Sequence, residues 1–286
     1  MSLFAELHRP GSPGLFITGT DTGVGKTVAA CLIADQFRRQ TLEVAPRSRI
    51  GVFKPIATGC RREREGLVSD DAEQLAHAAD FDPDVGNLAL INPIRFRPPL
   101  APAAALEKLG RSARLEVDEI DASLRRLDER CAAIVVEGIG GVMVPLARSE
   151  SRGGGRKGRG QCETVLDLMA AIGYPVVVVC RAGLGTLNHT AMTVRLIREA
   201  GLTLAGLVMN GYDPESTDES MQSNRAWLAR QNQTSVLATL PGWTGTGRSR
   251  KAIHWDVRAI DPALREAIDS CDFAALCRRG RGVGAS

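Results

Sequence analysis

The chain has 286 residues, of which 44% are hydrophobic and 24% are charged, and its formal net charge is +3. This composition is ordinary for a globular protein with a sizeable core, and the small charge gives no reason to expect a nucleic-acid partner. The longest strongly apolar run, residues 176–180, is far too short to span a bilayer, so we expect no membrane partner either.

The cysteines and the first residues of the chain indicate the cellular compartment in which the protein is found. The seven cysteines form no Cys-x-x-Cys pair, and their number is odd. Such a set is typical of reduced thiols rather than of a disulfide framework. The first ten residues contain no long apolar segment of the kind found in secretory signals. We therefore expect a cytoplasmic protein.

The most informative stretch is a glycine-containing loop near the N-terminus. An apolar run over residues 15–17 precedes the loop, Lys26-Thr27 ends it, and a helical pattern follows. Strand, loop and helix in this order predict a phosphate-binding site, in which backbone N–H groups and the helix N-terminus attract the anion. Four residues usually separate the first glycine of such a loop from its Gly-Lys pair, whereas five separate Gly19 from Gly25. The loop is therefore a longer variant.

Apolar runs typical of strands alternate with helical patterns along the rest of the chain. Strands are expected at residues 50–53, 132–136, 176–179, 204–209 and 235–239, and helices at residues 71–79, 117–130, 187–200 and 219–230. Residues 92–102 carry four prolines and are expected to be irregular. Continuous apolar strands separated by helices predict a three-layer α/β fold, in which helices cover both faces of a mainly parallel sheet. We find no domain linker and expect a single domain over residues 1–286.

Polar residues stand where several of these strands are expected to end. Lys54 follows the second strand, Glu137 the third and Asn210 the fifth. Ligands of parallel sheets bind beyond the carboxyl ends of the strands, so these side chains are candidates for one site. A carboxylate at the end of a buried strand beside a phosphate loop is a typical Mg²⁺ ligand, which favours a metal role for Glu137. A lysine at the end of a strand, as Lys54 is, is as often a solvated surface residue as a functional one.

Two further segments each allow two interpretations. Asp70-Asp71 precedes a predicted helix, and an acidic pair there is more typical of a helix N-terminus than of a Mg²⁺ site. Residues 148–162 are rich in glycine and arginine, and we expect a flexible surface loop. Arginine–glycine tracts also bind RNA, but this tract is short and has no aromatic residue.

Several motifs occur in one order and at compatible spacing, and together they resemble the dethiobiotin synthetase family. The motifs stand at residues 19–27, 54–59, 71–72, 92–93, 136–141 and 184–189 and at Asn210. The resemblance spans residues 14–212, with a weaker similarity up to residue 243. The longer phosphate loop is the form that this family uses.

The resemblance implies a P-loop NTPase fold and an ATP-dependent ligase of biotin biosynthesis. Its reaction would be the closure of 7,8-diaminononanoate with CO₂ into dethiobiotin, with Mg²⁺ as cofactor and with release of ADP and phosphate. It also implies a homodimer in which the partner subunit contributes to the substrate site. These are properties of the family and are not visible in composition or periodicity.

The resemblance also implies roles for individual residues. Lys54, Thr22 and Lys26 would be catalytic, and Thr27, Asp71 and Glu137 would bind Mg²⁺. The substrate would be bound by Thr58, Thr186, Leu187 and Asn188. The nucleotide would be bound by Gly23, Val24, Gly25, Lys26, Thr27, Val28, Glu137, Gly140, Asn210, Pro241, Gly242 and Trp243.

Two other classes remain as alternatives. A regulatory ATPase of the partitioning or cell-division-positioning kind shares the fold, but its loop carries a signature lysine where this chain has Asp21. Some such proteins bind membranes through a C-terminal amphipathic helix. Here residues 264, 268, 271 and 275 form an apolar face with acidic residues nearby, which favours a packed terminal helix. A nucleotide-binding module without chemistry is the third possibility, and Lys54, Asp71 and Glu137 argue against it.

Overall fold

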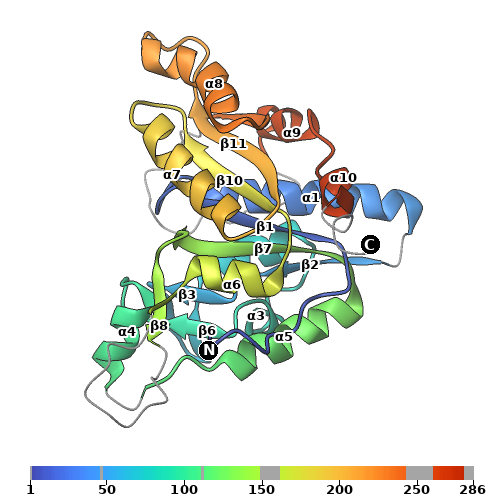
Figure 1. The fold of residues 1–286 in the computed structure, drawn as a ribbon. Helices are drawn as coiled ribbons and strands as arrows, with labels where there is room; N and C mark the ends of the chain where they lie inside the picture. The colour runs from blue at the N-terminus through green and yellow to red at the C-terminus, as the bar shows by residue number, and fades with distance from the viewer. Residues whose placement is uncertain (1, 46–47, 111–112, 149–161, 243–259, 280–286) are drawn as a thin grey trace, which may run out of the picture.

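A six-stranded parallel sheet forms the centre of the computed structural model, which describes residues 2–45, 48–110, 113–148, 162–242 and 260–279. The strand order is β12-β11-β10-β1-β7-β2 (Figure 1). The strands are β1 (Gly14–Gly19), β2 (Arg49–Phe53), β7 (Cys131–Gly141), β10 (Val176–Arg181), β11 (Leu204–Tyr212) and β12 (Val236–Pro241). All neighbouring strands run parallel, so their carboxyl ends meet at one edge of the sheet.

Helices cover both faces of this sheet. Helix α1 (Lys26–Val44) leads from β1 toward the β2 edge, and the helices that follow lead back across the sheet: α5 (Val117–Arg130), α6 (Val165–Ile172), α7 (Thr186–Glu199) and α8 (Glu219–Asn232). Because parallel crossovers are right-handed, the two directions place α1 on one face and the returning helices on the other (Figure 1). The C-terminal helices α9 (Pro262–Asp269) and α10 (Phe273–Arg279) pack beside α1. The predicted three-layer α/β fold is confirmed.

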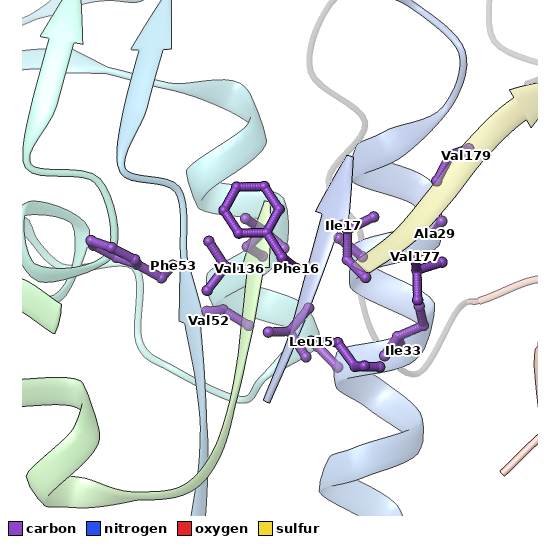
Figure 2. Close-up of a cluster of buried hydrophobic side chains, with 14 of the residues drawn as sticks. Leu15, Phe16, Ile17, Ala29, Ile33, Val52, Phe53, Val136, Val177 and Val179 are labelled. Atoms are coloured by element: carbon purple, nitrogen blue, oxygen red, sulfur yellow. The ribbon is translucent and has the colours of Figure 1, made fainter. Parts of the chain in front are cut away.

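The apolar strands run without interruption because both of their faces are buried. In Figure 2, Leu15 and Ile17 lie near Ala29 and Ile33 of α1, whereas Phe16 points away from that helix. All six residues of β1 are buried, as expected for a central strand with helices above and below. Each large apolar side chain buried in this way stabilises the fold by about 1.5–3 kcal/mol. The core therefore holds the strand that leads into the phosphate loop.

Smaller elements surround the carboxyl edge of the sheet. Strand β3 (Ile56–Thr58) pairs in parallel with β6 (Ile94–Phe96), β4 (Arg61–Glu63) pairs with β5 (Gly66–Val68), and β8 (Pro145–Arg148) pairs with β9 (Cys162–Thr164). Three more helices, α2 (Asp70–Ala78), α3 (Val85–Ile91) and α4 (Pro102–Leu109), lie between β5 and α5 in the chain. None of the helices in the described part of the chain has the length and apolar character needed to cross a membrane.

The expectation of an irregular segment over residues 92–102 is wrong in part. Strand β6 forms inside it, and the Ile94 N–H donates a hydrogen bond to the carbonyl of Pro55 at 3.2 Å. The prolines flank this three-residue strand and do not interrupt it, so no N–H needed for the pairing is missing. The prolines therefore mark the ends of the strand, and they do not prevent a strand from forming between them.

The single terminal helix expected from residues 264–275 is also wrong, because α9 ends at Asp269 and α10 begins at Phe273. The buried side chain of Gln36 binds at this break. Its amide donates to the carbonyl of Cys271 at 2.9 Å and accepts from the N–H of Phe273 at 3.1 Å. Buried backbone groups need partners, and Gln36 supplies them from α1. Both helices still pack against the protein, with Leu264, Ile268 and Phe273 buried.

The glycine- and arginine-rich segment joins two paired strands. Arg148 at the end of β8 pairs with Cys162 at the start of β9 in an antiparallel arrangement. Residues 149–161, on which the prediction of a flexible loop rests, lie outside the described part of the chain.

Candidate active site

The phosphate loop lies between the ends of β7 and β11. Gly25 has φ +96°, and a Cβ there would lie 2.0 Å from Nδ2 of Asn210, so this position requires glycine. The same Nδ2 donates a hydrogen bond to the Val24 carbonyl at 3.0 Å. On the other side, a Cβ on Gly140 would lie 3.4 Å from the hydroxyl of Thr22. The predicted loop residues and the ends of two sheet strands are therefore in close contact.

Lys26 opens α1 and turns back over the loop. Its Nζ donates a hydrogen bond to the carbonyl of Asp21 at 2.8 Å, and the side chain is largely buried. Burial lowers the pKa of this ammonium group to about 8, an effect to which nearby Lys54 adds and which Glu137 opposes. The ammonium group of Lys26 thus lies close to the loop backbone, where it would interact with the negative charge of a phosphate bound by the loop.

Four predicted residues from four separate segments form one cluster. Oγ1 of Thr27 lies 2.8 Å from Oε1 of Glu137 and 3.1 Å from Oδ1 of Asp71. Nζ of Lys54 lies 2.8 Å from Oε1 of Glu137 and 2.8 Å from Oδ2 of Asp71. Thr27 comes from α1, Lys54 from the end of β2, Asp71 from α2 and Glu137 from β7. The structure therefore brings together the proposed metal ligands and the proposed catalytic lysine.

The charges in this cluster control one another. Burial alone would lower the pKa of Lys54, but the carboxylates of Asp71 and Glu137 outweigh it and raise that pKa. The Lys54 ammonium in turn lowers the pKa of Asp71. Burial raises the pKa of Glu137, which is only 1% exposed. Lys54 is consequently held as a cation at neutral pH, and a solvated lysine, the other interpretation of this position, does not describe it.

The backbone around the cluster is also fixed by hydrogen bonds. The buried side chain of Asn92 donates to the carbonyl of Lys54 at 2.6 Å and to that of Ile94 at 3.2 Å. At the start of α2, Ser69 is the N-cap, and its hydroxyl accepts a hydrogen bond from the N–H of Ala72 at 3.4 Å. Asp71 is therefore not the capping residue, and its carboxylate is turned toward Thr27 and Lys54.

The oxygen atoms of the cluster fit a magnesium ion. Thr27 contributes a hydroxyl, Asp71 and Glu137 contribute carboxylates, and Oε2 of Glu137 is buried without a hydrogen-bond partner among the described residues. A buried carboxylate oxygen without a partner is costly unless a cation or water satisfies it. The part of the chain that the structure describes contains no group of three or more His, Cys, Asp or Glu that could hold a metal on its own. A cation here would need further oxygen ligands, as Mg²⁺ bound to nucleotide phosphates does.

Other predicted residues lie outside this cluster. Thr58 ends β3 and is half-buried, and Thr22 in the loop is exposed. Thr186 opens α7, but its buried hydroxyl faces that of Thr190 at 3.5 Å. Leu187 and Asn188 follow it on the same helix and are half-buried and exposed, respectively.

The positions proposed for the nucleotide base lie at the end of β12. Pro241 pairs with Tyr212 of β11, and the Gly242 N–H donates to the Tyr212 carbonyl at 3.2 Å. This places them beside the strand that carries Asn210. Trp243 lies outside the described residues. Val28 follows Thr27 in the first turn of α1 and is half-buried.

Sequence reasoning gave no role to two residues that contact the site. Asn92 belongs to a motif of the resemblance, yet only the fold shows that its side chain holds the backbone of Lys54. Arg181 ends β10, and its Nη2 donates to the carbonyl of Thr22 at 3.2 Å. A charged residue directly after an apolar strand was the available signal for Arg181, the same signal that drew attention to Glu137.

The strand–loop–helix unit with Lys-Thr at the helix start defines a nucleotide-binding protein of the P-loop class. A family model described as an AAA domain matches residues 13–249. An ATP-dependent dethiobiotin synthetase of Anaeromyxobacter dehalogenans (strain 2CP-C) is 40% identical, and the match covers 84% of this chain and 95% of that protein. One of Thermodesulfovibrio yellowstonii is 33% identical, covering 83% and 92% of the two chains. The chain therefore belongs to the ATP-dependent dethiobiotin synthetase family.

Solved structures support the fold. The ATP complex of a variant of the McdA protein of Cyanothece superposes with a TM-score of 0.51 at 10% identity, and the match covers 97% of this chain and 99% of that one. At this level of identity the similarity concerns the arrangement of sheet and helices alone.

Proposed function

We propose that this protein catalyses the Mg²⁺- and ATP-dependent closure of 7,8-diaminononanoate with CO₂ into dethiobiotin, releasing ADP and phosphate, in biotin biosynthesis. Membership of the family supports the reaction. The observation that carries the proposal is the Lys54 ammonium, held between Asp71 and Glu137 next to the phosphate loop. A protein that only binds nucleotide has no evident use for a buried lysine at this place.

The reaction needs positioning and charge neutralisation more than acid–base chemistry. One amine of the substrate adds to CO₂, loses a proton and forms a carbamate. A carbamate oxygen then attacks the γ-phosphorus of ATP, and ADP leaves. The second amine attacks the carbamate carbon, phosphate leaves, a proton is released and the ring closes. Negative charge develops on oxygen atoms in each of these steps, and fixed cations and N–H groups stabilise such charge.

The residues of the site divide these tasks. Lys26 and the N–H groups at the start of α1 would hold the β- and γ-phosphates. Lys54 and Thr22 would face the carbamate and the γ-phosphate, while Thr58 would bind the substrate. Thr27, Asp71 and Glu137 would hold Mg²⁺, which when bound neutralises phosphate charge. Asn210, Pro241, Gly242 and Trp243 would surround the adenine.

The substrate's carboxylate and the subunit arrangement belong to the same proposal. The first turn of α7, with Leu187 and Asn188, would bind the carboxylate tail at the site of a partner subunit, since helix N-termini attract anions. The adjacent side chains of Leu184 and Met192 are 90% and 51% exposed, and a second copy of the chain would cover such apolar surface. We therefore propose a homodimer with two composite sites.

We also propose that the reaction takes place in the cytoplasm and that residues 1–286 act as one domain. Cys31, Cys60 and Cys180 are buried free thiols, which suits a reducing compartment.

The direct test is the release of ADP from ATP and Mg²⁺, measured with and without 7,8-diaminononanoate plus bicarbonate. We expect turnover only when both are present, together with one dethiobiotin for each ADP. ATP turnover that ignores the diamine but responds to DNA or to lipid vesicles would instead support the regulatory ATPase and refute the synthetase.

A further inference from the structure

Three carbonyl groups of the phosphate loop are each bound by a side-chain donor. The Asp21 carbonyl accepts from Nζ of Lys26 at 2.8 Å, and the Val24 carbonyl accepts from Nδ2 of Asn210 at 3.0 Å. Between them, the Thr22 carbonyl accepts from Nη2 of Arg181 at 3.2 Å. The first donor belongs to the loop's own helix, whereas the other two come from the sheet.

Arg181 and Asn210 are neighbours across two strands. They are register partners at the carboxyl ends of β10 and β11, and the Ala182 N–H donates to the Asn210 carbonyl at 3.0 Å. The sheet therefore fixes the spacing of the two backbone positions from which these side chains reach the loop. Together they form a bracket that holds the loop at two points, one on each side of Gly23.

The bracket has a consequence for anion binding. A carbonyl oxygen that faces a phosphate repels it, whereas a backbone N–H attracts it. A carbonyl oxygen that accepts a hydrogen bond from Arg181 or Asn210 points toward the sheet and therefore does not face a bound phosphate. Gly23 and Gly25 have φ of +71° and +96°, the left-handed conformation that turns successive N–H groups toward one side. Because this loop is one residue longer than usual, it has one more peptide group to orient.

Arg181 has no other evident task. Its side chain is exposed, and within the described residues it forms no ion pair and no hydrogen bond except that to Thr22. We propose that Arg181 is a positioning residue of the nucleotide site, which acts with Asn210 to hold the long loop in its anion-binding shape. The inference rests on nucleotide binding by the proposed enzyme but not on the identity of the second substrate.

Dissociation constants for Mg-ATP and Mg-ADP, measured by calorimetry without diamine, test this assignment. We expect Arg181→Ala to weaken the binding of both nucleotides about five- to tenfold, which corresponds to the loss of one hydrogen bond at an exposed position. Arg181→Lys keeps a cationic donor and should recover part of the affinity for both. Arg195→Ala is the matched control, because that exposed arginine on α7 pairs with Glu199 on its own helix.

Each other result overturns the assignment. Unchanged affinity would mean that the contact with Thr22 has no function. A loss confined to ATP would mean that the guanidinium binds the γ-phosphate directly. A fall in the unliganded Tm that accounts for the weaker binding would make Arg181 a general stabilising residue. Because diamine is absent, a protein that fails to make dethiobiotin can still give a clear result.

Discussion

The two halves of the sheet's carboxyl edge are built differently. At the ends of β2 and β7, the side chains of Lys54, Asp71, Glu137 and Thr27 bind one another, and two of them are fully buried. At the ends of β10 and β11, Arg181 and Asn210 bind backbone carbonyls at more exposed positions. The first half presents charge, and the second half controls the shape of a loop.

This difference predicts how sensitive each half is to change. Charge interactions are stronger where water is excluded, so the loss of one member of the buried cluster leaves another charge without compensation. When a contact between Arg181 or Asn210 and the loop is lost, water can still hydrogen-bond to the groups that made it, so the loss costs less. We therefore expect large effects on catalysis from the first half and moderate effects on nucleotide affinity from the second.

The largest effect is expected for Lys54→Ala. Removing the cation that binds both Asp71 and Glu137 should lower ring closure about 1000-fold, while ATP binding survives. Steady-state ADP release and calorimetry would measure the two properties. Ring closure at the normal rate would remove Lys54 from the site.

A double variant separates charge from stability in this half. Lys54→Met alone leaves Glu137 buried without its cation and should destabilise the fold by about 3–5 kcal/mol. Combined with Glu137→Gln, it removes both charges, so thermal unfolding should show a large part of the stability regained while activity stays lost. If activity returned together with stability, the cluster would be structural.

The next effect concerns the metal. Glu137→Gln keeps the size of the side chain but removes a charged ligand, and the Mg²⁺ concentration needed for half-maximal turnover should rise at least about 10-fold. Chelation of Mg²⁺ by EDTA should stop turnover of the unmodified enzyme. Glu163→Gln is the matched control, because that buried carboxylate binds Ser2 and Leu3 instead. An unchanged Mg²⁺ requirement in the Glu137 variant would exclude Glu137 as a ligand.

A smaller effect tests the second half of the edge. Gly25→Ala would place a methyl group against Asn210 in a left-handed conformation, and ATP affinity should fall about 10-fold. Residue 23 has a similarly positive φ, but apart from its two chain neighbours no atom of the described residues would lie within 4 Å of the methyl group in Gly23→Ala. The difference between the two variants therefore measures the contact with Asn210. Equal losses in calorimetry would mean that backbone strain alone matters.

The smallest effect is expected far from both halves, at Asp128 of α5, which accepts hydrogen bonds from the N–H groups of Gly11 and Ser12. Partial burial raises the pKa of Asp128, but hydrogen bonds from the side chain and backbone of Ser12, the backbone of Gly11 and the ring of His8 outweigh it and lower that pKa to about 2. Its stabilising contribution is thus present above about pH 4 and is lost as the pH falls toward 2.

Asp128→Asn should lower the free energy of unfolding by about 1 kcal/mol at neutral pH. Thermal unfolding should show the difference from the unmodified protein narrowing as the pH falls from about 4 toward the pKa of Asp128, with turnover per folded molecule at neutral pH unchanged. A constant difference across this range would mean that the carboxylate charge is not what stabilises the segment before β1.

The amino-acid sequence by itself determined the phosphate loop, the parallel sheet and the placement of Lys54 and Glu137 at its carboxyl edge. These features depend on local patterns, such as apolar runs, glycine spacing and polar residues at strand ends. Helix α5 matches its predicted limits for the same reason. The tertiary structure alone decided where the carboxylate of Asp71 points, which backbone groups Asn92 and Arg181 bind, and where the chain breaks between α9 and α10 to bind Gln36. Each of these depends on contacts between segments far apart in the chain, and no local pattern contains that information.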